Sequence, residues 1–154
     1  MTCVFLPTPS GRQRFNVLGA LHAITREVIT VTNDTYINGE SVVTLLKRLA
    51  ERFTDHPITI VLDNARYQRN RYVMAEADRL GITLRWLPSY SPNLNLIERL
   101  WKFVKAECLH GHSYATFAPV KQAIEECLDQ TQDRHRKKLK TLLTLKFQRY
   151  DAAA

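Results

Sequence analysis

Residues 58–64 read ITIVLDN. Five apolar or β-branched residues end abruptly at Asp63 and Asn64, and helical patterns stand on both sides of them. A short apolar run between two helices is typical of a central parallel strand, which is covered on both faces. The sequence therefore predicts a layered α/β domain built around this strand.

The segments around this strand alternate between strand and helix. Two apolar or β-branched runs at residues 15–24 and 28–32 predict an antiparallel hairpin. A further strand is predicted over residues 82–87, where Pro88 stops it, and Gly81 just before it is placed to end a helix. Apolar residues at helical spacing predict helices over about 38–53, 69–80, 95–109 and 117–128. This order predicts a mixed sheet flanked by helices.

Length and composition describe one ordinary domain with a basic charge. The chain has 154 residues, of which 45% are hydrophobic and 24% charged, so wholesale disorder is excluded and a core can form without disulfides or a structural metal. There are 22 Lys and Arg against 15 Asp and Glu, a net charge of +7. This balance favours a polyanionic partner, nucleic acid before anionic lipid.

The cysteines and the chain start indicate a reduced compartment. Cys3, Cys108 and Cys127 are far apart, and no zinc-site spacing is completed by the nearest histidines. No signal peptide is evident, and no stretch approaches the roughly 20 apolar residues of a membrane helix. We therefore expect a soluble, cytoplasmic protein.

Two carboxylates are candidates for chemistry, and each has a structural alternative. Asp63 follows a strand, where ligand sites of open α/β sheets lie, and a carboxylate there can hold a metal. An Asx turn or a helix cap would explain the same position. Glu98 lies in the first turn of a predicted helix, where it could complete a capping box with Asn95 or pair with Lys102.

The joint pattern of the two acids is more specific than either alone. The triplet DNA at residues 63–65 follows a predicted strand, and 35 positions after Asp63 comes Glu98, within SPNLNLIERLW at residues 91–101. This resembles the DDE transposases of bacterial insertion sequences related to the mariner superfamily. In that family a D-N-A segment ends the fourth strand and an S-P-x-L-N-x-I-E-x-x-W segment carries the final acid. The resemblance covers most of the chain, from about residue 15 to about residue 128.

The resemblance implies a ribonuclease-H-like, retroviral-integrase-like fold and cut-and-paste chemistry on DNA. In this family two aspartates and a glutamate hold two divalent ions, Mg²⁺ or Mn²⁺, and carried over by position Asp63 is the second acid and Glu98 the third. Hard cations prefer carboxylate oxygen, and two ions roughly 3.5–4 Å apart can stabilise both the attacking and the leaving oxygen. Candidates for DNA contacts, with turn, cap or solvated-loop roles as alternatives, are Arg66, Tyr67, Arg69, Asn64 and Asn95.

One departure from the family pattern bears on activity. The family's first acid lies on a strand upstream of the hairpin, but residues 1–14 contain no Asp or Glu, and Asp34 would lie at the far end of the hairpin. We therefore expect an N-terminally truncated chain that lacks the first strand, leaves two strand edges without a partner and is a poor or inactive nuclease alone. A second departure is Gln68, where many relatives have a histidine.

The predicted organisation has three parts. Residues 1–14 are an N-terminal loop or remnant, residues 15–128 a partial DDE catalytic domain, and residues 129–154 a basic helical tail of the same domain. The tail could clamp DNA or be an amphipathic helix with its cationic side in water. The leading interpretation is a transposase fragment. The alternatives are a non-catalytic DNA- or transposase-binding remnant that modulates a full-length transposase, and an enzyme whose missing piece comes from an upstream reading frame.

Overall fold

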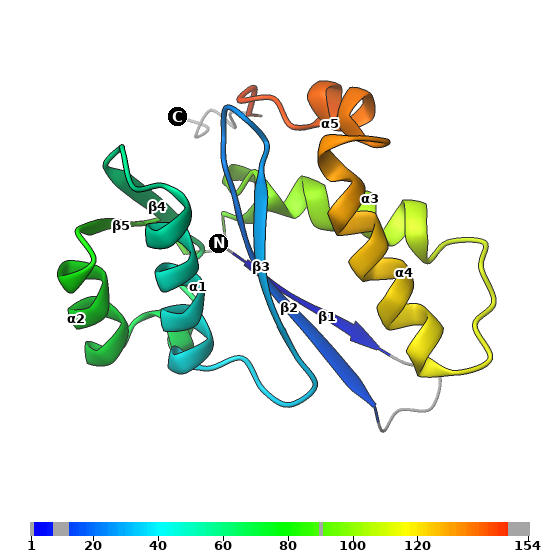
Figure 1. Ribbon diagram of the computed structural model, residues 1–154, viewed down its shortest axis with the longest axis horizontal. Helices are drawn as coiled ribbons and strands as arrows, with labels where there is room; N and C mark the ends of the chain where they lie inside the picture. The colour runs from blue at the N-terminus through cyan, green and yellow to red at the C-terminus, as the bar shows by residue number, and fades with distance from the viewer. Residues whose placement is uncertain (1, 8–12, 90, 148–154) are drawn as a thin grey trace, which may run out of the picture.

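The computed structural model describes residues 2–7, 13–89 and 91–147 of the chain (Figure 1). The elements in these ranges are β1 (Thr2–Pro7), β2 (Arg14–Leu21), β3 (Val28–Asn33), α1 (Gly39–Arg52), β4 (Ile58–Leu62), α2 (Arg71–Arg79), β5 (Ile82–Trp86), α3 (Ile97–Cys108), α4 (Phe117–Asp129) and α5 (Arg136–Leu142). Short 3₁₀ helices cover Arg66–Gln68, Pro92–Leu94 and Gln130–Gln132. Within these ranges no helix is long and apolar enough to cross a membrane.

The strands form two hydrogen-bonded groups. β2 lies between β1 and β3 and is antiparallel to both, whereas β4 and β5 pair in parallel. The predicted hairpin and the parallel pairing of the two later strands are thus confirmed. The prediction that the strand over residues 58–62 is covered on both faces is wrong, since Thr59 and Val61 are exposed. The described strands do not join into one sheet. β1 and β3 are the two outer strands of the first group, and neither is hydrogen-bonded to β4 or β5 among the described residues.

The prediction of a loop over residues 1–14 is wrong for residues 2–7, which form β1 and pair with β2 from Thr2 opposite Gly19 to Pro7 opposite Arg14. The expectation that no strand precedes the hairpin is wrong as well, because β1 pairs with the edge of β2 that was expected to lack a partner. The apolar run in this segment is too short to indicate a strand by its own pattern, and the pairing with β2 supplies the backbone hydrogen bonds that stabilise it. Residues 8–12 of the predicted loop lie outside the described residues.

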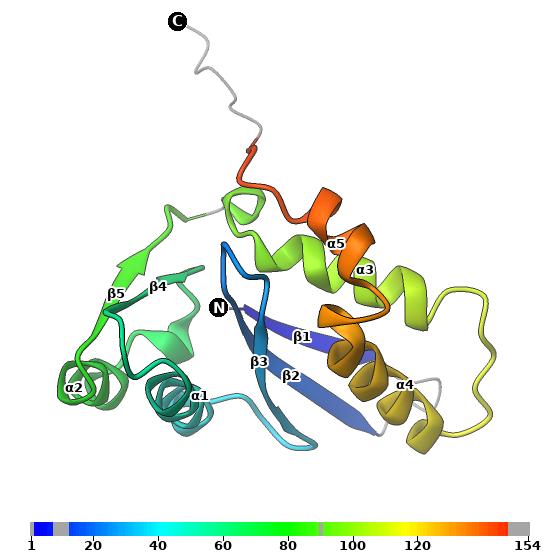
Figure 2. The same cartoon turned by 45° about the horizontal axis from the view of Figure 1, so that its top comes forward.

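Strand β2 divides the core into two clusters because its side chains alternate between two faces. Phe15 and Val17 pack with α3, α4 and α5, while Leu18 packs with Val31 and with residues of α1, α2, β4 and β5. Figures 1 and 2 show the same division, with α3, α4 and α5 on one side of the β1–β3 group and α1 on the other. The β1–β3 group therefore lies between helical layers, as the sequence predicts.

Helix α3 is held against β2 by one close approach. The side chain of Trp101 is 3% exposed, and a Cβ atom built on Gly19 would lie 2.7 Å from its ring carbons. Only glycine leaves room for the indole at this point. This contact fixes the helix that carries Glu98.

The start of α3 differs from the predicted capping box. The helix begins at Ile97 with Leu96 in the N-cap position, and the Leu96 side chain makes no capping hydrogen bond. Asn95 is buried, with 6% of its surface exposed, and its backbone carbonyl accepts the Glu98 N–H at 3.1 Å. The 3₁₀ turn Pro92–Leu94 precedes Asn95 and shifts the helix start by two residues relative to the prediction. By contrast, Gly81 ends α2 with φ +69° as predicted.

The basic C-terminal segment packs on α3. Leu139 and Leu143 are buried in the α3–α4 cluster, while the Lys138 ammonium lies 3.1 Å from the Glu107 carboxylate of α3. Helix α5 covers Arg136–Leu142, which is shorter than the predicted tail, and the Lys137 and Lys140 side chains are exposed. This arrangement is that of an amphipathic helix with its cationic side in water. Residues 148–154 of the tail lie outside the described part of the chain.

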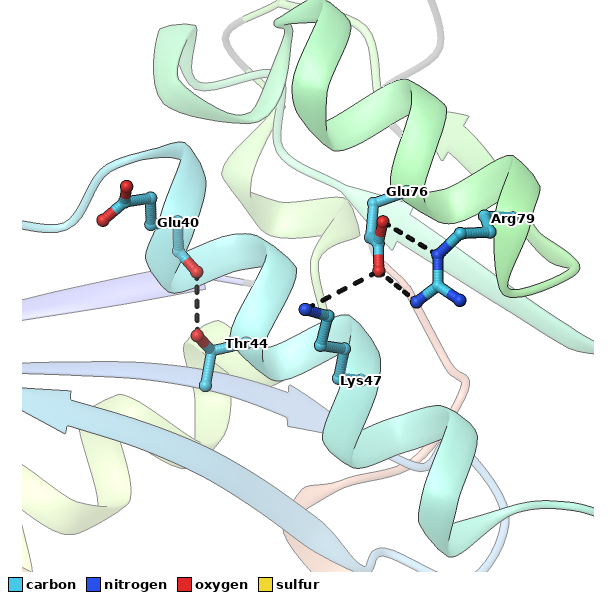
Figure 3. Close-up of polar contacts among 5 residues, drawn as sticks. All are labelled: Glu40, Thr44, Lys47, Glu76 and Arg79. Atoms are coloured by element: carbon cyan, nitrogen blue, oxygen red, sulfur yellow. Dashed lines mark hydrogen bonds and ion pairs between the residues drawn. The ribbon is translucent and has the colours of Figure 1, made fainter.

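Helices α1 and α2 are linked at the surface by a carboxylate that gives a pH-dependent contribution to stability (Figure 3). Arg79 donates two hydrogen bonds to Glu76, and the Lys47 ammonium of α1 lies 3.8 Å from the same carboxylate. The hydrogen bonds from Arg79 and the charges of Arg79 and Lys47 hold the pKa of Glu76 below its ordinary value. As the pH falls, the Glu76 carboxylate therefore takes up a proton in the unfolded chain at higher pH than in the folded protein. The contribution of Glu76 to stability is present above its ordinary pKa and is lost as the pH falls through its pKa in the folded state.

Replacement of Glu76 should remove this contribution. We expect Glu76→Gln to unfold at lower urea concentration than the wild type at pH 7, and the difference to shrink as the pH falls below about 4.5. Urea denaturation at pH 7 and near pH 3.5 measures it. Glu51→Gln is the control, because Glu51 is exposed on α1 and joins no ion pair of the described residues. Equal behaviour of the two variants would contradict the prediction.

Candidate functional site

Asp63 lies at the carboxyl end of β4, where the strand turns sharply. Leu62 is fully buried, Asp63 is half-buried, and Asn64 adopts the left-handed conformation with φ +73°. Asparagine is one of the few residues other than glycine that accepts this conformation at low cost. The turn leads into the 3₁₀ helix Arg66–Gln68, which folds back over the strand end.

The carboxylate of Asp63 is held by a side chain and not by a backbone cap. Its Oδ1 accepts a hydrogen bond from Gln68 Nε2 at 2.7 Å, and Gln68 Oε1 accepts the Ala65 N–H at 3.0 Å. No ion pair among the described residues includes Asp63, and its second oxygen has no hydrogen-bond partner among them. The Asx-turn and helix-cap explanations of Asp63 therefore do not describe the observed contact. A carboxylate that is not neutralised by an ion pair suits a cation ligand.

Glu98 lies in the first turn of α3 and is half-buried. The side chain of its neighbour Arg99 contacts the C-terminal segment. The Arg99 guanidinium donates to the carbonyls of Thr144 at 2.8 Å and Lys146 at 2.7 Å and stacks over Phe147 at 5.2 Å. This clasp ties the C-terminal segment to α3.

The chain segments that carry the two acids meet at one cavity. Leu87, the residue after β5, donates its N–H to the Leu62 carbonyl at 2.8 Å, so the route from β5 to α3 starts beside Asp63. A mainly apolar cavity of about 660 Å³ is lined by Val61 of β4 and by Asn95 and Ile97 at the start of α3. Residues close in sequence to each acid thus line the same space, whereas Asp63 and Glu98 themselves are not among its lining residues. That the two carboxylates reach a common cation stays a prediction.

The residues predicted to contact DNA fall into two groups. Arg66 and Arg69 are exposed beside Asp63, and the Arg69 guanidinium lies over the Trp86 ring at 4.8 Å. Tyr67 packs against the α1-side core, Asn64 is half-buried in the turn, and Asn95 is buried. The two arginines are therefore the members of this set best placed to reach a phosphate.

The remaining acids do not complete a cluster. Asp34 follows β3 and pairs with Lys121 of α4 at 3.6 Å. Among the residues that the structure describes, no three His, Cys, Asp or Glu side chains gather closely enough to hold a metal ion. Asp63 and Glu98 supply hard oxygen donors of the kind that Mg²⁺ and Mn²⁺ prefer, so the donor chemistry fits these ions with two acids instead of three.

The sequence did not indicate the role of Gln68. It is fully buried and makes the hydrogen bond that fixes Asp63. A polar residue five positions after a strand-end acid, followed by Asn70 as the N-cap of α2, was the available signal, but the fold-back of the turn cannot be inferred from spacing.

Comparison with known proteins places this site in context. Residues 2–121 match the family described as DDE superfamily endonuclease. In structure the chain is similar to a chain in a cryo-EM structure of the simian T-cell lymphotropic virus intasome in complex with PP2A regulatory subunit B56 gamma, with 13% sequence identity and a TM-score of 0.56. The match covers 86% of this chain and 47% of the other, so the chain spans about half the length of that neighbour. The likeness confirms the predicted ribonuclease-H-like fold. No curated protein matches the chain.

Proposed function

The chain belongs to the DDE superfamily endonucleases, and from this premise we propose that it is part of an insertion-sequence transposase. Its chemistry in this proposal is divalent-metal-dependent cleavage and transfer of DNA strands. Asp63 acts as the second acid of the family's set and Glu98 as the third. The first acid is not present among residues 1–14.

The observation that carries the proposal is the cavity shared by the segments around the two acids. Val61 lies two residues before Asp63, and Ile97 directly precedes Glu98, and both line this cavity. The bond between Leu87 and Leu62 keeps the start of the connecting chain beside Asp63. These contacts support the proposal that two acids 35 positions apart in sequence act together at the carboxyl end of β4.

In the proposed reaction, the two acids of this chain bind the metal ions. Asp63 and Glu98 would each offer carboxylate oxygen to Mg²⁺ or Mn²⁺, and β4 and α3 hold these side chains in place. When bound, such ions stabilise the attacking and leaving oxygens of an in-line displacement at phosphorus. Strand β1, which is antiparallel to β2, contains no Asp or Glu, so we propose that the 154-residue polypeptide alone does not cleave DNA.

The proposed DNA partner can be tested through the exposed arginines. Binding of a fluorescent duplex should weaken with salt, because phosphate contacts release counterions with a slope of about −0.9 in log K per contact. We expect Arg66→Ala/Arg69→Ala to bind more weakly and to lower that slope by about 2, at one contact each. Fluorescence anisotropy over a series of KCl concentrations measures both quantities.

The basic helix α5 supplies the comparison for this experiment. Lys137→Ala/Lys140→Ala removes the same charge from another exposed surface and should leave the salt slope unchanged. If the α5 variant loses affinity and the arginine variant does not, the tail contacts DNA and the arginines beside Asp63 do not. No DNA binding by any form would contradict the proposal.

A second candidate function, a non-catalytic remnant that binds another transposase chain, is favoured by the position of the cavity. Residues 58–61 of β4 and residues 20–24 at the end of β2 all line it. Successive side chains of a strand point to opposite faces, so a cavity lined by consecutive residues lies at the strand edge. An extended segment of another chain is the shape that fits between two strands. The segment would bind between the two described parts of the sheet.

A further inference from the structure

The side chain of Gln68 is buried at the end of β4 and bridges two fixed groups. It is 0% exposed, donates from Nε2 to Asp63 Oδ1 at 2.7 Å and accepts the Ala65 N–H on Oε1 at 3.0 Å. Both of its polar atoms therefore have partners, as burial of an amide requires. The contact with Asp63 joins residues five positions apart.

The surroundings allow only one orientation of this amide. A carboxylate can only accept and a backbone N–H can only donate, so the NH₂ group must face Asp63 and the carbonyl must face Ala65. The reversed amide would place oxygen against oxygen and nitrogen against N–H. Gln68 is thus a fixed donor to Asp63.

The backbone keeps Gln68 in reach of Asp63. Asn64, with φ +73°, reverses the chain after the strand, and the Gln68 N–H closes the 3₁₀ turn on the Ala65 carbonyl at 3.0 Å. Tyr67, the residue before it, packs against the core under α1. The donor therefore sits on an anchored turn and not on a mobile side chain at the surface.

A neutral donor suits a cation ligand better than a charged one. Lys or Arg at this place would cancel the charge of Asp63 and weaken its attraction for a metal ion. The Gln68 amide orients the carboxylate and leaves its charge in place, and the second oxygen has no hydrogen-bond partner among the described residues. We propose that Gln68 is a positioning residue, which holds Oδ1 of Asp63 so that the carboxylate is presented to a divalent cation. This inference rests on the proposed function.

The experiment measures Mn²⁺ affinity of the full chain by the electron paramagnetic resonance signal of free Mn²⁺. Gln68→Met keeps the length of the side chain and removes both hydrogen bonds, and it should weaken Mn²⁺ binding by about tenfold or more, as loss of a ligand-orienting partner does. Gln68→His retains a donor and should recover part of the affinity. Val73→Ala is the stability control, because Val73 is fully buried on α2 and its side chain takes no part in the hydrogen bonds of Gln68 and Asp63.

A second measurement reads the hydrogen bond without metal. The side-chain NH₂ signal of Gln68 in a ¹⁵N spectrum should shift in Asp63→Ala and stay in place in Glu51→Ala. If Gln68→Met binds Mn²⁺ as tightly as the wild type while Asp63→Ala does not, the positioning role is wrong. The role is also wrong if the NH₂ signal of Gln68 does not shift in Asp63→Ala. If the wild type and Asp63→Ala bind Mn²⁺ equally poorly, the proposed function fails and the role of Gln68 with it. If Val73→Ala loses as much Mn²⁺ affinity as Gln68→Met, the effect is one of general stability and the inference is overturned.

Discussion

Purified by itself, the 154-residue chain should leave supercoiled DNA intact in the presence of Mg²⁺, at the background level of its Asp63→Ala variant. In-line displacement by two metal ions needs ligands for both ions, and the described residues offer no cluster of three acids. Strand β1 pairs with β2 but contributes no carboxylate. Plasmid nicking followed on agarose gels measures this directly.

One result of this assay would contradict the prediction that the chain alone does not cleave DNA. Robust Mg²⁺-dependent cleavage that disappears in Asp63→Ala would show that two acids suffice, whereas cleavage that persists in that variant would come from a contaminant.

The same assay separates the two candidate functions when a full-length transposase of the family is added. A remnant that binds such a chain should lower its cleavage, Ile24→Glu at the exposed rim of the cavity should relieve this effect, and Tyr36→Glu, equally exposed outside the cavity, should not.

The second large effect concerns the strand that carries Asp63. Leu62 is fully buried in the α1-side core, so Leu62→Ala should destabilise the protein by about 2–5 kcal/mol and lower the melting temperature by roughly 5–15 °C. The adjacent Val61 is 44% exposed, and Val61→Ala should change stability by no more than about 0.5 kcal/mol. Thermal denaturation followed by circular dichroism compares the pair.

These two neighbours test the register of β4. A shift by one residue would exchange the faces of the strand and turn Leu62 towards solvent. A larger loss in Val61→Ala than in Leu62→Ala would therefore contradict the structure and the position that it gives to Asp63.

The local patterns of the sequence predicted most of the elements that frame the site. The β-branched run of β3, the helical spacing in α1 and α4, and the apolar run of β4 before Asp63 each identify their element from nearest neighbours. Gly81 ends α2 because a left-handed residue is needed there, which the residue type alone indicates. Patterns of this kind depend on the period of the backbone and require no knowledge of distant contacts.

The parts that were wrong or not foreseen depend on contacts made in the folded chain. Strand β1 is stabilised by pairing with β2, and the start of α3 follows a buried Asn95 and a 3₁₀ turn, with Leu96 in the N-cap position. The bond from Gln68 to Asp63 requires the left-handed turn at Asn64. The Arg99 clasp joins groups 45 and 47 positions apart, which spacing along the chain cannot indicate.

We propose that the carboxylates of Asp63 and Glu98 hold one divalent cation between them. The most direct test is a double-mutant cycle of Mn²⁺ affinity with Asp63→Ala, Glu98→Ala and the double variant. We predict that each single variant weakens binding at least about tenfold and that the double variant is hardly weaker than either, because both acids serve one site. Unchanged affinity in either single variant, or losses that simply add in the double variant, would contradict a shared site.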